Sequence, residues 1–260
     1  MNKDAYSKIK EELAHKKGLL FWDIETRPMQ AWIWKLGKQY ITHEQVAEES
    51  KVISIQWMFE GDKKVSYLTW DDKQDDKKML REFLKAIADA KVAVSQNGKQ
   101  FDHKVLNWRL NVHKLPPMPR MVIFDTLTLS RAAFRAPSHK LDYRSKIYGL
   151  GGKIKMALHN WIDVIAGQKS ALSKMAKYGC KDVEDLRNIF WRELPYYKSL
   201  PAELNLLVNP PQPKPEKVAR PFCPMCAKKH QARFNVMPLK KKTALFLRCK
   251  NCHYTWQKVG

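Results

Sequence analysis

The chain has 260 residues, of which 44% are hydrophobic and 11% aromatic, and it carries 48 Lys and Arg against 26 Asp and Glu. This composition excludes an intrinsically disordered chain, and the length allows one substantial core plus a small satellite. The formal charge of +22 favours a polyanionic partner, most commonly nucleic acid, over a merely solvated lysine surface.

The N-terminal residues contain no apolar run of the kind found in secretory signals. No stretch approaches the roughly 20 apolar residues that a membrane span requires. We therefore expect a soluble, cytoplasmic protein without a membrane partner. Thiols stay reduced in that compartment, so the five cysteines are better interpreted as metal ligands or core residues than as disulfides.

The first predicted strand lies in residues 18–26, where four apolar residues run directly into Asp-Ile-Glu. Successive side chains of a strand alternate between faces, so Asp23 and Glu25 point the same way while Ile24 points into a core. Two carboxylates on one side of a buried strand repel each other, and a divalent cation held by oxygen ligands is the usual remedy. The alternative for so short a motif is a strand end at which both acids face water.

An aromatic segment follows this strand. Arg27-Pro28 indicates the strand end, because proline withholds a backbone donor. Trp32, Trp34 and Tyr40 then occur among lysines. These side chains have two interpretations: they pack beneath a loop, or they stack on unpaired bases, because aromatic faces beside positive charge suit single strands.

The next part of the chain predicts a sheet with helices packed on it. Residues 52–59 and 65–68 are β-branched and aromatic runs separated by Glu-Gly-Asp-Lys, which indicates a hairpin. With the first strand they predict a three-stranded antiparallel unit. Residues 75–90 show apolar residues at helical spacing, and residues 92–95 read as a short buried strand. This change from consecutive strands to alternating strands and helices predicts a mixed α/β sheet.

A second acidic position follows that strand. Asn97-Gly98 indicates a turn, so Asp102 lies near the start of the next helix. Sheets that contain parallel strands bind ligands at such strand ends, although a first-turn acid can simply complement the helix dipole. A further strand at residues 121–124 ends in Asp125, for which a helix N-cap is favoured over a role as a site acid.

The third acidic position lies on the last predicted helix, residues 170–191. Tyr178 and Asp182 are four residues apart and therefore share one helix face. Gly179 lies between them and allows a break in the helix. Asp185 is an alternative ligand if the register is shifted, but the spacing from Tyr178 favours Asp182.

The three positions read Asp-x-Glu, Asn-x-x-x-Phe-Asp and Tyr-x-x-x-Asp, in that order. Together they resemble the motifs of the DEDD 3′–5′ exonucleases of the ribonuclease-H-like superfamily, in the subtype with a tyrosine in the third motif. The resemblance spans about residues 18–195 and is similar to the proofreading domains of family-B DNA polymerases. It implies a ribonuclease-H-like mixed sheet flanked by helices. We also expect Asn97, in the second motif, to contact nucleic acid.

The resemblance further implies a site for two Mg²⁺ or Mn²⁺ ions, to which four carboxylates are suited. By resemblance, Asp23 would bridge the two ions and Asp102 would support the second. Glu25 and Asp182 would hold the ion that activates water. Tyr178 would orient that water, since a phenol is a poor base at neutral pH.

The C-terminal part has a different composition. Residues 201–221 are rich in proline and predict a linker between an exonuclease domain at 1–200 and a zinc-ribbon domain at 222–260. Beyond the linker, two Cys-x-x-Cys pairs separated by 22 residues offer four ligands for one tetrahedral Zn²⁺. These ligands are Cys223, Cys226, Cys249 and Cys252.

The tail is also strongly basic. From residue 214 onward it has 12 Lys and Arg and one Glu, a net charge of +11 and half of the excess of the chain. We expect it to bind phosphates without reading sequence, although a ribbon that docks a protein is the alternative. The candidate contacts are Lys240, Lys241, Lys242 and the stacking side chain Trp256.

The sequence as a whole predicts a metal-dependent 3′–5′ exonuclease that acts on single strands or 3′ ends of DNA. Three alternatives stay open: an exoribonuclease, a structure-selective endonuclease, and a non-catalytic nucleic-acid-binding protein. A replication or repair protein is a further candidate partner.

Overall fold

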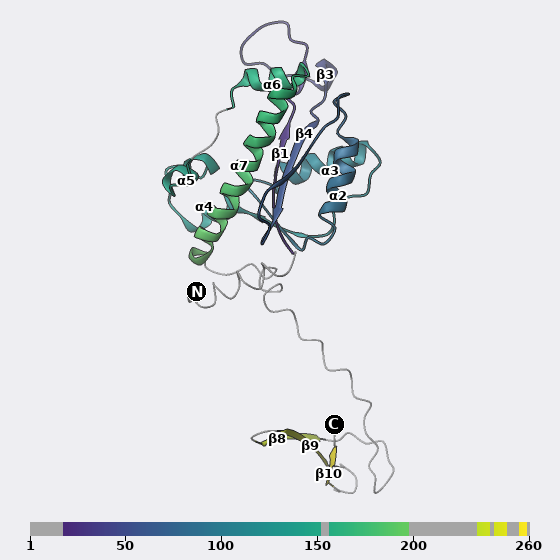
Figure 1. Ribbon diagram of the computed structural model, residues 1–260, viewed down its shortest axis with the longest axis vertical. Coiled ribbons are helices and arrows are strands. Elements are labelled where there is room, and N and C mark those ends of the chain that lie inside the picture. The colour runs from purple at the N-terminus through teal and green to yellow at the C-terminus, as the bar shows by residue number, and fades with distance from the viewer. Residues whose placement is uncertain (1–17, 152–155, 198–232, 240–241, 249–254, 259–260) are drawn as a thin grey trace. The chain divides into compact units, whose positions relative to one another are not determined.

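The structure is a computed structural model that describes residues 18–151, 156–197, 233–239, 242–248 and 255–258 (Figure 1). The four predicted zinc ligands, the Pro-rich linker, Lys240 and Lys241 lie outside these residues. The chain divides into two compact units, Met1–Asn209 and Pro210–Gly260. Within the described residues, no helix has the length and apolar character needed to cross a membrane.

A five-stranded mixed sheet forms the centre of the first unit, in the order β5-β4-β1-β6-β7. β4 is antiparallel to both β1 and β5, which confirms the predicted antiparallel unit. β6 is parallel to β1, and β7 is parallel to β6. The strands are β1 (Leu19–Thr26), β4 (Val52–Phe59), β5 (Ser66–Thr69), β6 (Val92–Ser95) and β7 (Val122–Asp125).

Helices cover both faces of this sheet, with α2 and α3 on one face and α7 on the other (Figure 1). α7 is continuous, so the break that Gly179 allows in the sequence does not occur. The helices are α2 (Lys77–Ala86), α3 (Asp102–Val112), α4 (Thr126–Ala133), α5 (Leu141–Ile147), α6 (Leu158–Ile165), α7 (Lys169–Glu193) and the short 3₁₀ helix η2 (Leu194–Tyr196).

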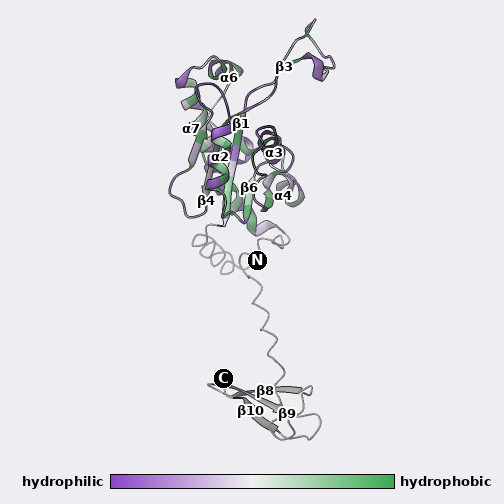
Figure 2. Ribbon diagram, turned by 90° about the vertical axis from the view of Figure 1, so that its right-hand side faces the viewer, coloured by the Kyte–Doolittle hydropathy of each residue, from purple (hydrophilic) through white to green (hydrophobic). Residues whose placement is uncertain are grey.

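The side chains of β1 alternate between two cores, as the period of a strand requires. Even-numbered positions 20–24 pack with α2 and α3, whereas Leu19 and Phe21 pack against α7. Figure 2 shows the hydrophobic colour concentrated in the sheet between the helices. Asp23 and Glu25 continue the series of Leu19 and Phe21, so the strand directs both carboxylates toward the α7 face.

An arm formed by residues 28–50 separates β1 from β4. Its strand β2 (Gln30–Ala31) pairs antiparallel with β3 (Val46–Glu48), and the 3₁₀ helix η1 (His43–Gln45) precedes β3. Figure 2 shows the arm projecting from the sheet and its helices, beside the label β3. We call residues 28–50 the aromatic arm.

The second unit contains a three-stranded antiparallel sheet in the order β10-β9-β8. Its strands are β8 (Arg233–Leu239), β9 (Lys242–Arg248) and β10 (Thr255–Lys258). Of the predicted tail contacts, Lys242 begins β9 and Trp256 lies in β10.

Candidate active site

Three carboxylates from β1 and α7 lie together. Asp23, Glu25 and Asp182 each offer a carboxylate oxygen, and these oxygens all lie within 4.8 Å of one another. Asp182 is buried, and the other two residues are half-buried. Carboxylates at this separation repel one another unless protons or a cation offset their charge, and oxygen ligands of this kind suit Mg²⁺ or Mn²⁺.

A close approach of α7 to β4 allows this grouping. Gly179 lies so near β4 that a Cβ at this position would be 2.4 Å from the side-chain amide carbon of Gln56. Gln56 is fully buried and lies opposite Asp23 in the β1–β4 register. The missing side chain of Gly179 therefore brings the flanking Tyr178 and Asp182 close to the strand that carries the other two acids.

Asp102 joins the group from the start of α3. Its Oδ1 accepts a hydrogen bond from the backbone N–H of Ile24 at 3.3 Å, and its carboxyl hydrogen-bonds with that of Asp23. Burial raises the pKa of Asp102 to about 7, and the nearby charge of Asp125 acts in the same direction. The hydrogen bonds from the backbone and from Asp23 oppose this rise. Asp102 is therefore in contact with the Asp23 end of the cluster.

Asp125 positions the loop that leads into Asp102. Its carboxylate accepts hydrogen bonds from the backbone N–H groups of Asn97 at 3.1 Å and Lys99 at 3.3 Å. It also accepts from two amides in the first turn of α4, so the predicted N-cap is confirmed. The sequence analysis missed the bonds across to the loop. A signal for them existed, because Asp125 ends a strand that was predicted beside the one before Asn97.

The turn at Asn97-Gly98 has the backbone that its residue types favour. Asn97 has a positive φ of 66°, a conformation that asparagine tolerates better than most residues. At Gly98, a Cβ would lie 1.8 Å from the hydroxyl oxygen of Ser95. This tight turn returns the chain over the end of β6 and places Asp102 against β1.

Tyr178 lies one helical turn before Asp182 and is buried, with 8% of its surface exposed. The Trp161 ring of α6 packs edge-on against it, with ring centroids 6.5 Å apart and an interplanar angle of 75°. This contact fixes the direction of the phenol ring on the α7 face that carries Asp182.

Asp185 has a different environment from Asp182. It accepts a hydrogen bond from the Ser145 hydroxyl at 2.7 Å and forms an ion pair with Lys181. Lys181 also donates to the carbonyl of Leu150 at 2.9 Å. Asp185 therefore links α7 to α5, and Asp182 is the α7 acid that lies in the carboxylate cluster.

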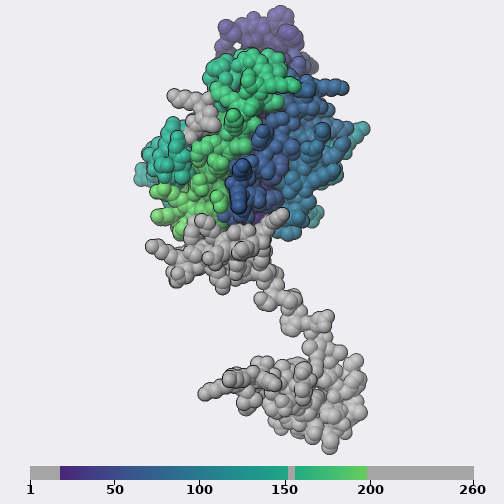
Figure 3. All heavy atoms as spheres, viewed as in Figure 1, coloured from purple at the N-terminus to yellow at the C-terminus, as the bar shows by residue number. Residues whose placement is uncertain are grey.

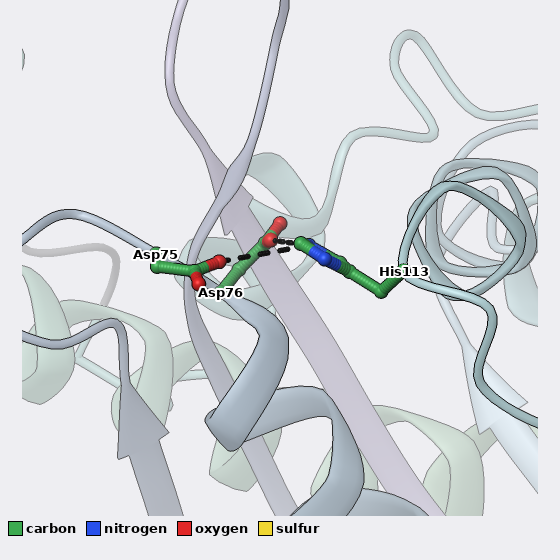
Figure 4. Close-up of side chains that lie close together, drawn as sticks. All are labelled: Asp75, Asp76 and His113. Carbon is green, nitrogen blue, oxygen red and sulfur yellow. Dashed lines mark hydrogen bonds and ion pairs between the residues drawn. The ribbon is translucent and has the colours of Figure 1, made fainter.

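A second group of candidate metal ligands comprises Asp75, Asp76 and His113 (Figure 4). Asp76 is fully buried and accepts two hydrogen bonds from the Arg109 guanidinium, at 2.8 and 2.9 Å, and one from the amide of Val52. Burial would raise the pKa of Asp76, but its hydrogen bonds with Arg109, Val52 and His113 outweigh that effect and lower it. Arg109 already supplies the positive charge that a cation would bring, so this group fastens α2 and α3 to β4.

Comparison with known proteins supports a nuclease. The family model described as RNase_T, exonuclease, matches residues 63–163, a range that includes Asp102 but neither β1 nor α7. No protein with a curated description matches the chain.

The fold is also found in a solved structure. The family B DNA polymerase from the hyperthermophilic archaeon Pyrobaculum calidifontis matches with a TM-score of 0.51 and 15% sequence identity, over 73% of this chain. The match covers 26% of the polymerase, so this chain corresponds to about a quarter of its length. The likeness confirms the predicted mixed α/β, ribonuclease-H-like fold.

Proposed function

We propose that this chain is a metal-dependent 3′–5′ exonuclease that hydrolyses phosphodiester bonds of DNA at single strands or 3′ ends. The observation that carries the proposal is the convergence of Asp23, Glu25 and Asp182, with Asp102 in contact through Asp23. The match to an exonuclease family model and the polymerase-like fold support it. The net charge of +22 suits a phosphate-rich substrate.

The four acids fit hard divalent cations. Two bound Mg²⁺ or Mn²⁺ ions would supply a water-derived nucleophile at neutral pH and stabilise the leaving oxygen. Asp23 is suited to ligate both, because it touches the Glu25–Asp182 pair on one side and Asp102 on the other. Tyr178, held by Trp161, would orient the attacking water beside Asp182.

We propose a supporting role for the tail. Cys223, Cys226, Cys249 and Cys252 would bind one structural Zn²⁺, since four thiolates at this spacing suit tetrahedral zinc. The basic residues around them would tether the substrate by its phosphates. The proposed boundaries are 1–200 for the nuclease domain, 201–221 for the linker and 222–260 for the ribbon.

The test is hydrolysis of end-labelled single strands. Purified protein is incubated with DNA and RNA oligonucleotides labelled at either end, in Mg²⁺, Mn²⁺ or EDTA. We expect stepwise loss of nucleotides from the 3′ end of DNA with either ion and none with EDTA. Asp23→Asn should abolish the reaction, whereas Asp89→Asn, which changes an exposed acid elsewhere, should leave it intact.

Other outcomes decide between the alternatives. Faster loss from RNA than from DNA would identify an exoribonuclease, and cleavage of closed circular single strands would identify an endonuclease. Binding without hydrolysis in any metal would contradict the enzymatic proposal and favour a non-catalytic nucleic-acid-binding protein.

A further inference from the structure

The aromatic arm exposes large apolar side chains to water. Trp34 is 99% exposed, Tyr40 89% and Trp32 75%. These values contradict packing beneath a loop, which was one of the two interpretations of the sequence. Figure 3 shows the arm as purple spheres at one end of the first unit. Its exposed large apolar residues are Met29, Trp32, Ile33, Trp34, Leu36, Tyr40 and Ile41.

Hydrogen bonds within the arm hold these side chains outward. The Trp32 N–H donates to the carbonyl of Gln45 at 2.8 Å, and the Gln45 side-chain amide donates to the carbonyl of Trp32 at 3.2 Å. The Thr42 N–H donates to the Gln45 side-chain oxygen at 3.0 Å. The outgoing and returning strands are therefore joined without burial of the aromatic rings. The rings form an exposed surface on an ordered backbone.

Charge is segregated along the arm. Residues 29–43 contain Lys35, Lys38 and His43 but no carboxylate. The acids of the arm begin at Glu44, on its return toward the sheet. Within the described residues, the arm thus presents aromatic rings interleaved with cations and without nearby negative charge in the sequence, a combination that suits the bases and phosphates of single strands.

The base of the arm adjoins the strand that carries two of the clustered acids. Thr26 pairs with Val52, so the arm leaves and re-enters the sheet at the β1 end that carries Glu25. There the Arg27 N–H donates to the Lys51 carbonyl at 2.9 Å, and Arg27 forms an ion pair with Glu48. The arm is therefore fixed at its base one residue beyond the acid motif.

We propose that the aromatic arm binds unpaired nucleobases by stacking and so makes single-stranded nucleic acid the substrate class of the carboxylate site. This inference rests on the proposed function, because the position of the arm beside the acids matters only if a nucleic-acid strand reaches them. Unpaired bases are favoured over a protein partner because cations alternate with separate, outward rings, and the neighbouring acids suit phosphodiester chemistry.

Base-dependent binding tests the arm. Fluorescence anisotropy is measured in EDTA with a labelled 12-nucleotide oligothymidylate and with a strand of equal length that is abasic at its internal positions. The full-length protein should bind the first strand more tightly. Trp32→Ala with Trp34→Ala should weaken binding to oligothymidylate by about 5- to 100-fold per lost stack and leave abasic binding unchanged.

Two controls separate stacking from disturbance of the fold. Trp32→Phe with Trp34→Phe keeps aromatic faces and should retain most of the preference for bases. Tyr67→Ala removes a ring on β5 that is 54% exposed, and it should change neither affinity. Equal weakening on both strands, or none, in the double alanine variant would overturn the inference. So would a dimer of the parent protein that this variant dissolves while its DNA affinity stays the same.

A small substrate distinguishes failure of this inference from failure of the proposed function. The p-nitrophenyl ester of thymidine 5′-monophosphate presents a phosphodiester without a strand for the arm to hold. The arm variants should hydrolyse it at the parental rate in Mn²⁺ while losing activity on oligothymidylate. A parent that hydrolyses neither substrate contradicts the exonuclease; a parent that hydrolyses both, with variants that match it on both, contradicts only the arm.

Discussion

Asp102 is the clustered acid that holds a proton most strongly in the metal-free protein, within the groups whose pKa is resolved. Burial is the main cause, and the charge of Asp125 adds to it. An acid that is protonated near neutrality lowers the repulsion in a cluster without metal. The same proton competes with a metal ion, so pH should govern both stability and metal binding.

The first prediction concerns this linkage. The pKa of Asp102 is about 7 when folded and 3.8 as a model value, so the folded state keeps a proton that the unfolded chain releases between these values. Without metal, the contribution of Asp102 to the free energy of unfolding is therefore greatest below about pH 4 and decreases as pH rises to about 7. Mn²⁺ affinity should rise over the upper part of this range, by up to about tenfold per pH unit, because binding displaces the proton.

Thermal unfolding from pH 4 to 8, with and without Mn²⁺, measures both effects. Asp102→Asn mimics the neutral acid, so its metal-free Tm should fall less than that of the parent as pH rises. Identical pH slopes for the parent and Asp102→Asn would contradict the assignment of this effect to Asp102.

The second prediction separates two acids that are three residues apart. Asp182→Asn should reduce nuclease activity by about 100-fold or more, because it removes a charged group of the proposed metal site. Without metal, its Tm should equal or exceed that of the parent, since a repulsive charge is lost. Asp185→Asn should instead lower the free energy of unfolding by about 1–3 kcal/mol, because it weakens the bonds with Lys181 and Ser145.

Activity per folded molecule and urea unfolding distinguish these variants. The specific activity of folded Asp185→Asn should stay near the parental value. The reverse pattern, with activity lost at Asp185 and stability lost at Asp182, would show that the structure assigns the two acids wrongly.

At the scale of elements, Gly179 shows what the sequence could not provide. A glycine in a helical pattern indicates a weak point, because it has low helix propensity. The structure instead has a continuous helix in which Gly179 faces the buried Gln56. This role depends on which strand lies opposite, and no local pattern contains that information.

The third prediction uses this contact. In a helix without such a contact, Gly→Ala stabilises by roughly 0.5–1 kcal/mol. Gly179→Ala should instead destabilise by about 1–3 kcal/mol, because the new methyl group meets a side chain that has no free space. Activity should also fall, since the helix that carries Tyr178 and Asp182 must move. Urea unfolding and the oligonucleotide assay measure the two effects.

A double-mutant cycle identifies the cause. Gln56→Ala shortens the opposing side chain, so Gly179→Ala should cost much less stability in that background. An equal cost in both backgrounds would show that the effect does not arise from the contact with Gln56.

Local patterns predicted most of the elements, because the hydrophobic period of each strand and helix is clear in the sequence. The boundaries were less exact where a side chain has a distant partner. The helix predicted over residues 75–90 begins at Lys77, after Asp76 turns its carboxylate to Val52 and Arg109. The double role of Asp125 was missed for the same reason: its bonds to the loop before Asp102 join separate elements.

At the scale of the whole molecule, the sequence predicted the ribonuclease-H-like fold because three short motifs occur in the right order on the right elements. It left two questions that only a three-dimensional arrangement answers: which α7 acid joins the cluster, and whether the arm buries its rings. The α7 acid is Asp182, and the rings of Trp32, Trp34 and Tyr40 face water.

The distribution of charge along the chain supports the last prediction. The tail from residue 214 onward holds half of the positive excess of the protein. Release of counterions from phosphates makes the affinity of such a segment decrease as salt increases, with a slope near −0.7 per phosphate contact for single strands. Removal of residues 216–260 should therefore weaken binding to oligothymidylate at low salt and flatten the plot of log affinity against log salt concentration.

A matched variant separates charge from loss of the segment. Lys240→Ala, Lys241→Ala and Lys242→Ala together keep the four cysteines and should flatten the slope in part. Both variants should retain hydrolysis of the p-nitrophenyl ester, because the carboxylate cluster belongs to the first unit, which has its own core. An unchanged slope after removal of the tail would contradict the tether and place the phosphate contacts on the first unit. Loss of ester hydrolysis would instead show that the tail contributes directly to the site.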